Sequence, residues 1–293
     1  MNKESAPDSG IRINPKDIIS IDPVVTFKYI LETMKKDKPN PVFGVAERFL
    51  QLFQDHNVML TQIPRLIPEV TLEKLKDAES LLSVLTPDVL EKTAKLFQIK
   101  LNWLEGETKT IFNCYYCYKN PQKFFEDSKT LKIAEFERPM IAFCAVSKLN
   151  NKSGKDQKII LVQRERCAKL GEKIIYRYRI CEGFLWGYWK SRIELKAVMR
   201  VWYKKYKIPV PIFQIDEKIL EGIEEGYIVP EQYIRRNKRF NTDGLEDFSL
   251  SLEEDRLSKE SDELPTVLEY IEDYQLEKRK KTTNSSNTLK WTQ

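Results

Sequence analysis

The fold of this chain is decided by residues 43–107, which read FGVAERFLQLFQDHNVMLTQIPRLIPEVTLEKLKDAESLLSVLTPDVLEKTAKLFQIKLNWLEGE. Apolar residues recur in this stretch every three or four positions, which is the spacing of an amphipathic helix. No part of it shows the alternation of apolar and polar residues that indicates a β-strand. We therefore predict four or five short helices that pack into a small α-helical domain.

Capping residues divide this stretch into separate helices. Thr61 is the predicted N-cap of a short helix that Pro68 ends. After a tight turn, Thr71 opens a second helix that extends to Leu82. Thr86 opens another, because a proline at the first helical position and an acid in the first turn follow it. Two short capped helices joined by a tight turn predict a helix-turn-helix.

The pattern resembles the λ-repressor-like (XRE) helix-turn-helix family of DNA-binding proteins. The residues that carry the resemblance are Leu60 to Gln62, Val70, Thr71, Glu79, Pro87 to Leu90, Ala94, Leu96, Phe97, Ile99 and Trp103 to Glu107. The resemblance implies that the second helix rests on the phosphate backbone and that the third lies in the major groove. It also implies a homodimer that binds paired half-sites on double-stranded DNA.

The resemblance also assigns contacts to individual residues. Thr61 and Gln62 match positions that touch phosphates, and the face that meets DNA comprises Thr71, Leu72, Glu73, Lys74, Lys76 and Asp77. Two of these residues, Glu73 and Asp77, depart from the family pattern, because carboxylates repel phosphates and bases are usually read by Arg, Asn, Gln, Ser or Thr. Residues 41–110 carry 8 Lys+Arg and 10 Asp+Glu. Either another segment supplies the positive charge that DNA binding needs, or the helical fold serves a different contact.

Residues 111–240 carry an excess of positive charge that residues 41–110 lack, with 27 Lys+Arg against 15 Asp+Glu. Short apolar or alternating runs predict strands over 139–146, 158–164, 173–184 and 210–215, and helical spacing predicts helices over 191–207 and 216–225. We therefore predict a basic, antiparallel α+β domain that senses a small-molecule effector or mediates dimerisation. Its positive charge would supply the electrostatics that the helical domain lacks.

A turn rich in aromatic residues stands out within this basic domain. Gly183 and Gly187 flank Trp186, and the candidate contacts for a small anion or ligand are Arg177, Arg179, Trp186, Lys190 and Arg192. Aromatic rings beside cations can stack bases or hold an anionic ligand. Trp186 can equally be a core side chain, and the basic runs at 204–207 and 235–239 can be solvated surface.

The sequence offers little for catalysis or metal binding. Cys114 and Cys117 form a single C-x-x-C, and His56 is the only histidine, so a structural zinc site lacks its other ligands. The remaining interpretation is a pair of thiols in an aromatic helix. There is no G-x-x-x-x-G-K-[ST] or G-x-G-x-x-G loop for nucleotide phosphates. We expect no enzyme activity, no cofactor and no metal.

The two ends of the chain are predicted to be simpler. Residues 1–20 are polar and expected to be flexible, while 23–37 predict a helix that joins the helical domain over 21–110. Residues 241–293 carry 13 Asp+Glu against 7 Lys+Arg and predict a largely disordered acidic tail. A helix over 265–281 is the exception, with an apolar stripe that docks on the chain itself or on a second subunit.

These observations predict a multidomain protein and a function. Five cysteines at irregular spacing fit reduced thiols, and the chain has no run of 18 apolar residues and no secretory signal, so a cytoplasmic protein without membrane contact is expected. The predicted function is a sequence-specific transcriptional regulator. The alternative is a non-enzymatic protein- or RNA-binding factor, including a secreted or host-directed one, that keeps the helix-turn-helix fold for partner contact.

Overall fold

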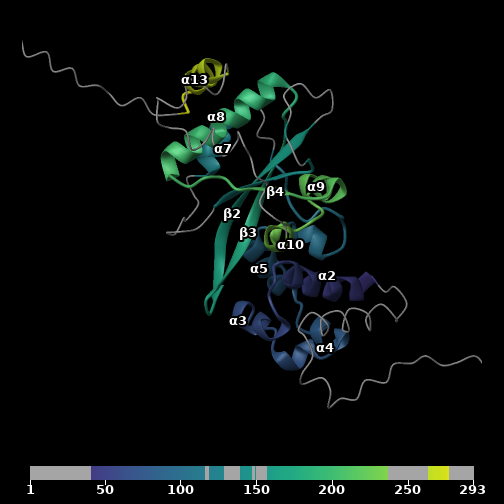
Figure 1. Ribbon diagram of the computed structural model, residues 1–293. Coiled ribbons are helices and arrows are strands. Elements are labelled where there is room, and N and C mark those ends of the chain that lie inside the picture. Colours follow the sequence, from purple (N-terminus) through teal and green to yellow (C-terminus); the bar gives the residue numbers. More distant parts are fainter. Residues whose placement is uncertain are drawn as a thin grey trace, which may run out of the picture. The chain divides into compact units, whose positions relative to one another are not determined.

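A computed structural model describes residues 41–115, 119–128, 139–146, 149, 157–236 and 263–276 (Figure 1). The chain forms two compact units that alternate along the sequence. Unit 1 comprises Met1–Asn113, Arg166–Tyr178 and Glu225–Arg236, and unit 2 comprises Cys114–Glu165, Arg179–Glu224 and Asn237–Gln293. The domain limits drawn from the sequence stay predictions. The flexible start, the helix at 23–37 and the acidic tail before residue 263 lie outside the described residues.

Unit 1 combines short helices with the strand segment Arg166–Tyr178, and its helices confirm the predicted helical region. In chain order they are α2 (Pro41–Asp55), η2 (Leu60–Gln62), α3 (Ile63–Leu66), η3 (Leu72–Leu75), α4 (Ala78–Leu82), α5 (Pro87–Phe97), α6 (Leu101–Leu104) and α10 (Glu231–Arg236), where η denotes a 3₁₀ helix. The start of α5 follows the predicted cap: Thr86 Oγ1 accepts a hydrogen bond from the Val89 nitrogen at 3.4 Å, and Pro87 opens the helix. Local sequence therefore accounts for this helix.

The core of unit 1 is aromatic. Phe49 and Phe53 of α2 lie with their ring centroids 4.9 Å apart, and Phe97 of α5 meets Phe53 edge-on at 5.2 Å. All three side chains are fully buried. Such tilted and edge-to-face pairs are favourable arrangements for aromatic rings, so this cluster ties the leading helix to α5.

Within the described residues, the sheet has four strands in the order β3-β2-β1-β4, namely β1 (Met140–Cys144), β2 (Lys158–Leu170), β3 (Lys173–Leu185) and β4 (Ile212–Gln214). Strands β1 and β2 pair antiparallel, as expected, with Ala142 opposite Leu161. Strands β1 and β4 pair parallel, with Ala142 opposite Ile212. A further parallel bridge joins Tyr115 to Cys181 of β3. The prediction of an antiparallel domain is therefore wrong, and the sheet is mixed.

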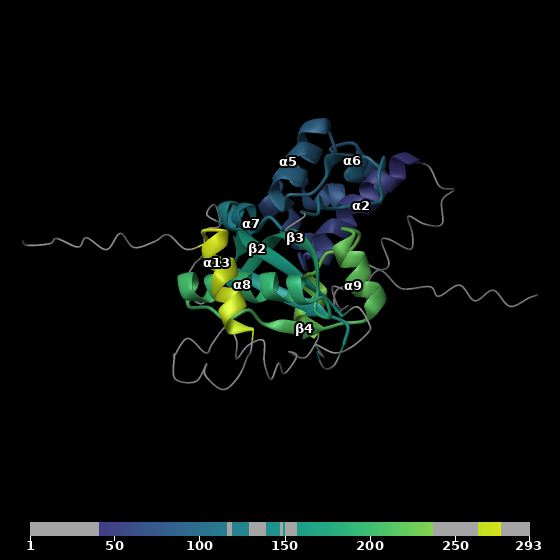
Figure 2. The ribbon, with the colours of Figure 1, turned by 90° about the horizontal axis from the view of Figure 1, so that it is seen from above.

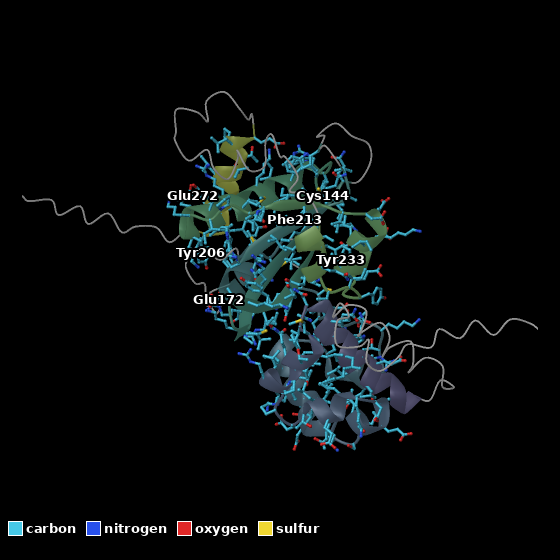
Figure 3. The ribbon with its side chains drawn as sticks, turned by 60° about the horizontal axis from the view of Figure 1, so that its bottom comes forward. Cys144, Glu172, Tyr206, Phe213, Tyr233 and Glu272 are labelled. Carbon is cyan, nitrogen blue, oxygen red and sulfur yellow. The ribbon has the colours of Figure 1, made fainter. Side chains whose placement is uncertain are left out.

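The parallel pairing has a topological cause. The helix α8 (Trp189–Tyr206) lies between β3 and β4 in the chain, and a crossover helix lets the strand that follows it run parallel to a neighbour. The residues of β1 and β4 do not by themselves indicate which strand each will pair with. Cys144 and Phe213 mark the two paired strands in Figure 3.

Helices cover both faces of the sheet within unit 2. The remaining helices are α7 (Pro121–Ser128), α9 (Glu217–Glu224) and α13 (Leu264–Asp273). Ala142 of β1 and Leu161 of β2 share a buried cluster with Phe124 of α7 and Trp202 of α8. The alternate residue Phe143 points to the other face, where it packs on Phe213 at 5.9 Å and where α9 contacts β1. This double coverage explains why all five residues of β1 are buried.

Helix α13 docks on α8 of the same chain (Figures 1 and 2). Val267 and Ile271 of α13 enter the core cluster of unit 2. The helix expected over 265–281 is thus present over Leu264–Asp273, and its apolar stripe packs on its own chain. Gln122 Nε2 also donates a hydrogen bond to the Tyr274 carbonyl at 3.0 Å, which places the end of α13 beside α7.

Candidate functional site

The first predicted contact segment is a 3₁₀ turn followed by one turn of α-helix. Residue Met59, not Thr61, is the N-cap, and Gln62 Oε1 accepts a hydrogen bond from the Met59 backbone nitrogen at 3.1 Å. The predicted cap at Thr61 is wrong because a Gln three residues after Met59 supplies the capping bond. The side chains of Thr61 and Arg65 are exposed. The sequence reasoning overlooked Arg65, although it is the only Lys or Arg between residues 49 and 73.

The predicted reading helix is divided in two. Thr71 precedes η3 without a side-chain capping bond, and α4 begins again at Ala78. The Asp77 carboxylate accepts a hydrogen bond from the Ser80 nitrogen at 2.7 Å, and this bond holds the pKa of Asp77 below its ordinary value. A continuous helix from Thr71 to Leu82 is therefore wrong. Asp is a strong N-cap and a poor interior residue, so the chain restarts the helix at this position.

The exposed face of these segments carries mixed charge. Glu73, Lys76 and Asp77 are exposed, while the Lys74 ammonium donates to Ser83 Oγ at 3.3 Å. Leu72 leaves 57% of its surface exposed between these polar residues. The face can thus present two ammonium groups to phosphates, but the carboxylates beside them oppose that contact.

A buried titratable cluster in unit 1 escaped the sequence reasoning. His56 follows α2 with 2% of its surface exposed, and its Nδ1 lies 2.8 Å from the Leu52 carbonyl oxygen. Its ring lies 4.2 Å from that of Phe97 and 5.7 Å from that of Tyr178, whose hydroxyl donates to Glu231. Burial lowers the pKa of His56 to about 4, so the ring is neutral at pH 7. These three polar residues are far apart in sequence, and no local pattern links them.

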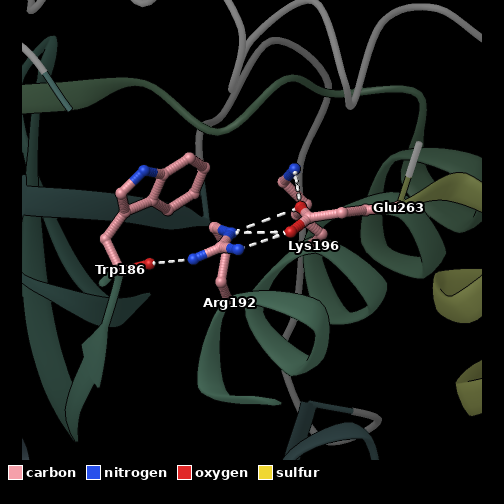
Figure 4. A network of polar contacts seen from close by, with 4 residues as sticks. All are labelled: Trp186, Arg192, Lys196 and Glu263. Carbon is pink, nitrogen blue, oxygen red and sulfur yellow. Dashed lines mark hydrogen bonds and ion pairs between the residues drawn. The ribbon is translucent and has the colours of Figure 1, made fainter. Parts of the chain in front are cut away.

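In unit 2, the predicted ligand contacts Trp186 and Arg192 belong to an internal network (Figure 4). Arg192 Nη1 donates to the Trp186 carbonyl, and Arg192 Nε donates to the Glu263 carboxylate at 3.0 Å and 3.2 Å. Lys196, one helical turn later, donates to the same carboxylate at 2.6 Å. The Arg192 and Lys196 cations lie 5.9 Å and 5.3 Å from the centre of the Trp186 ring.

This network corrects two of the predicted roles. Trp186 is 6% exposed and is a core side chain, so it offers no surface for stacking. Arg192 is equally buried and is neutralised by Glu263, an acid from the other end of the chain. Burial acts to raise the pKa of Glu263, but hydrogen bonds from Arg192 and Lys196 outweigh it and lower the pKa. The carboxylate is therefore charged in this network at neutral pH.

The other predicted anion contacts lie on β3 and at the start of α8. Arg177 and Arg179 are half-buried on β3, each with an interaction partner in the protein, and they belong to unit 1 and unit 2 respectively. Lys190 is exposed, and its ammonium lies 5.4 Å from the centre of the Trp189 ring. Of the five residues that the sequence grouped, the structure thus joins Trp186 and Arg192 in one network and assigns Arg177 and Arg179 to different units.

Exposed lysines lie beside aromatic rings at both ends of α8. At its start, Tyr188 and Trp189 are 42% and 53% exposed. At its end, near the Tyr206 label in Figure 3, the Lys205 ammonium lies 4.6 Å from the Tyr206 ring and that of Lys207 lies 5.9 Å from the Tyr203 ring. Lysines over aromatic rings suit contact with anions or nucleic acid. The sequence pattern predicted that cations beside aromatic rings would contact an anion, but it assigned that contact to Trp186 rather than to the two ends of α8.

The described thiols are half-buried or buried. Cys114 is half-buried, and Cys117 lies outside the described residues. Burial raises the pKa of Cys144 to about 12, which keeps that thiol protonated and unreactive. Within the part of the chain that the structure describes, no three His, Cys, Asp or Glu side chains gather in a way that could hold a metal ion.

Two further findings bear on function. Among the described residues, no helix combines the length and the apolar character needed to cross a bilayer. Comparisons with protein-family models, curated proteins and solved structures found no match to this chain.

Proposed function

We propose that this protein is a DNA-binding transcriptional regulator of the λ-repressor-like type, which acts on double-stranded DNA as a homodimer. The observation that carries the proposal is the pair of short helical segments η2–α3 and η3–α4, which pack on α2 and on each other with a five-residue connection between them. In this arrangement Thr61, Arg65 and Lys76 remain exposed for contact with the backbone of a duplex.

Unit 2 has the electrostatic role in this proposal. Unit 1 lacks an excess of positive charge in its helical segment, whereas α8 ends in the exposed residues Lys204, Lys205 and Lys207. Neutralising phosphates with lysines supplies sequence-independent affinity and steers association. The same unit would sense an effector or form the dimer contact.

Duplex binding by fluorescence anisotropy tests the proposal. Full-length protein is titrated against labelled duplexes selected from a random pool, at several salt concentrations. The double variant Lys74→Ala/Lys76→Ala should lose selective binding, whereas Lys204→Ala/Lys205→Ala should weaken all duplexes about equally and flatten the salt dependence. Lys95→Ala is the matched control, because Lys95 is an exposed lysine on α5 that pairs with Glu91 at 3.0 Å. Binding that none of these variants changes would contradict the proposal.

A second candidate is a protein-binding module, and one observation favours it. Leu72 is more than half exposed at the centre of the predicted reading face, and Glu73 and Asp77 flank it with negative charge. An exposed leucine among carboxylates suits a basic, partly apolar protein surface better than a phosphate backbone. In that case Leu72→Ala would abolish partner binding, while duplex binding would be weak and indifferent to Lys74 and Lys76.

A further inference from the structure

The C-terminal ends of α8 and α13 pack on one core cluster in unit 2. Shortly after α13, the Leu276 backbone nitrogen donates to the Ile271 carbonyl at 3.1 Å, and the Leu276 side chain packs on this cluster. Tyr206, the last residue of α8, packs on the same cluster. The core of unit 2 therefore fixes the place of both helix ends.

A series of contacts joins these two helix ends through α7. Gln122 Nε2 of α7 donates to the Tyr274 carbonyl at 3.0 Å. Two residues later on α7, the Phe124 ring lies 6.4 Å from the ring of Trp202 on α8, and the Trp202 ring lies 4.4 Å from that of Tyr206. Figures 1 and 2 both show α7 and α13 next to α8. The chain therefore leaves α13 beside the C-terminal end of α8.

Two exposed lysines at the end of α8 are held over aromatic rings. The Lys205 ammonium lies 4.6 Å from the centre of the Tyr206 ring, and the Lys207 ammonium lies 5.9 Å from that of Tyr203. Tyr206 is itself held by the fully buried Trp202. A lysine side chain that is already ordered loses less conformational entropy when it binds a partner. These two ammonium groups are therefore preorganised for contact with an anion.

A run of consecutive cations follows α13 in the sequence. Residues 278–281 read KRKK, and they lie outside the described residues. Lys278 is the second residue after Leu276, and an extended chain spans at most about 3.6 Å per residue. The backbone of Lys281 therefore stays within about 18 Å of Leu276. This run is thus tethered to the side of unit 2 where α8 ends.

We propose that the end of α8 and residues 278–281 together bind the phosphate backbone of duplex DNA as one composite surface. This inference rests on the proposed function and assigns its sequence-independent contacts. The cations of the surface are Lys204, Lys205, Lys207, Lys278, Arg279, Lys280 and Lys281. They outnumber the acids at the end of α13 and just after it, which are Glu272, Asp273 and Glu277. A duplex carries one negative charge per about 1.7 Å of its axis, so this surface can neutralise several phosphates within one helical turn.

Fluorescence anisotropy of the full-length protein tests the surface with a labelled duplex of arbitrary sequence and about 12 base pairs, roughly one helical turn. Each phosphate contact that is lost lowers the slope of log K against log[salt] by about 0.9. Alanine at all four positions of 278–281 should therefore lower the slope by up to about 3.6. Lys204→Ala/Lys205→Ala/Lys207→Ala should lower it by up to about 2.7. At a shared surface both variants weaken the same binding event, and a protomer takes up no more than one duplex.

Two control variants separate this surface from net charge and from the tail as such. Thr282→Ala/Thr283→Ala/Ser285→Ala/Ser286→Ala changes four tail residues without removing charge and should bind as wild type. Lys109→Ala/Lys169→Ala/Lys218→Ala removes three exposed lysines from other parts of the chain and should change the slope by less than about 0.5. The variant at 278–281 leaves the core of unit 2 intact, so it serves even if the α8 variant does not fold.

The outcomes distinguish this inference from the proposed function. A salt slope that the variant at 278–281 leaves unchanged would overturn the composite surface, and so would two duplexes bound per protomer. In either case a wild type that still selects duplexes through Lys74 and Lys76 would keep the proposed function. A wild type without affinity for any duplex would overturn both.

Discussion

Arg192 on α8 and Glu263 before α13 form a nearly buried ion pair, with hydrogen bonds from Arg192 Nε at 3.0 Å and 3.2 Å and another from Nη2. The side chains expose only 7% and 22% of their surface. The pair joins two segments that are 71 residues apart in sequence. This pair explains why Arg192, which the sequence suggested as a contact for an anion, cannot bind an anion while α13 is docked on α8.

Removing the acid from this pair should destabilise unit 2. Glu263→Ala leaves Arg192 and Lys196 buried without their shared carboxylate, which is costly because unpaired buried cations lose hydration without compensation. Since Glu263 is partly exposed, we expect a loss on the order of 2 kcal/mol in the free energy of unfolding rather than the full cost of a buried pair. Denaturant unfolding measures it, and Glu269→Ala on the exposed face of α13 should change the stability by less than about 0.5 kcal/mol.

Two substitutions at Asp77 separate its role as a helix N-cap from the effect of its negative charge. Asp77→Ala removes the bond to the Ser80 nitrogen and should lower the stability of unit 1. Asp77→Asn keeps a good cap and removes only the negative charge, so stability should hold. If this face contacts DNA, the Asn variant should bind duplexes more tightly than wild type in anisotropy measurements. An Asn variant with unchanged duplex affinity would show that the Asp77 charge lies away from DNA.

His56 should make the stability of unit 1 fall in acid. Its folded pKa of about 4 is below the unfolded value of 6.5, so its contribution is complete above pH 6.5 and is lost as pH falls through 4. The maximum loss is on the order of 3 kcal/mol. Asp55 acts oppositely, because burial raises its pKa to about 6. The free energies of unfolding of wild type and His56→Gln are therefore compared at each pH. The difference between them should shrink toward pH 4, and a constant difference would contradict this prediction.

Gly106 is required where α6 ends. Its φ of +91° lies in the left-handed region, and an added Cβ would stand 2.8 Å from Arg48 Nη1. Gly106→Ala should therefore cost between about 1 and 2 kcal/mol, mostly from backbone strain, because the Arg48 guanidinium is the end of a flexible side chain and can move aside. Gly171→Ala is the matched control, with φ +64° and open space around the new atom. It should cost only the strain, about 1 kcal/mol, and equal losses in thermal unfolding would rule out the contact with Arg48.

Local patterns in the sequence were enough to predict the helical character of residues 43–107 and the approximate positions of the individual strands. Thr86, Pro87 and Asp88 define the start of α5 because capping involves only neighbouring residues. The apolar spacing within 265–281 likewise predicted an amphipathic helix there, since one helical face is defined within two or three turns. Such features depend on residues that are close in the chain.

Tertiary structure alone decided the rest. Whether β4 pairs parallel with β1, and whether Glu263 reaches Arg192, depends on segments that meet only after folding. The division at Asp77 shows that capping can outweigh a helical apolar pattern that the sequence presents without interruption. Burial has the same origin: Trp186 is a core residue and Trp189 a surface one, although three positions separate them, because only packing determines which side of a turn faces the core.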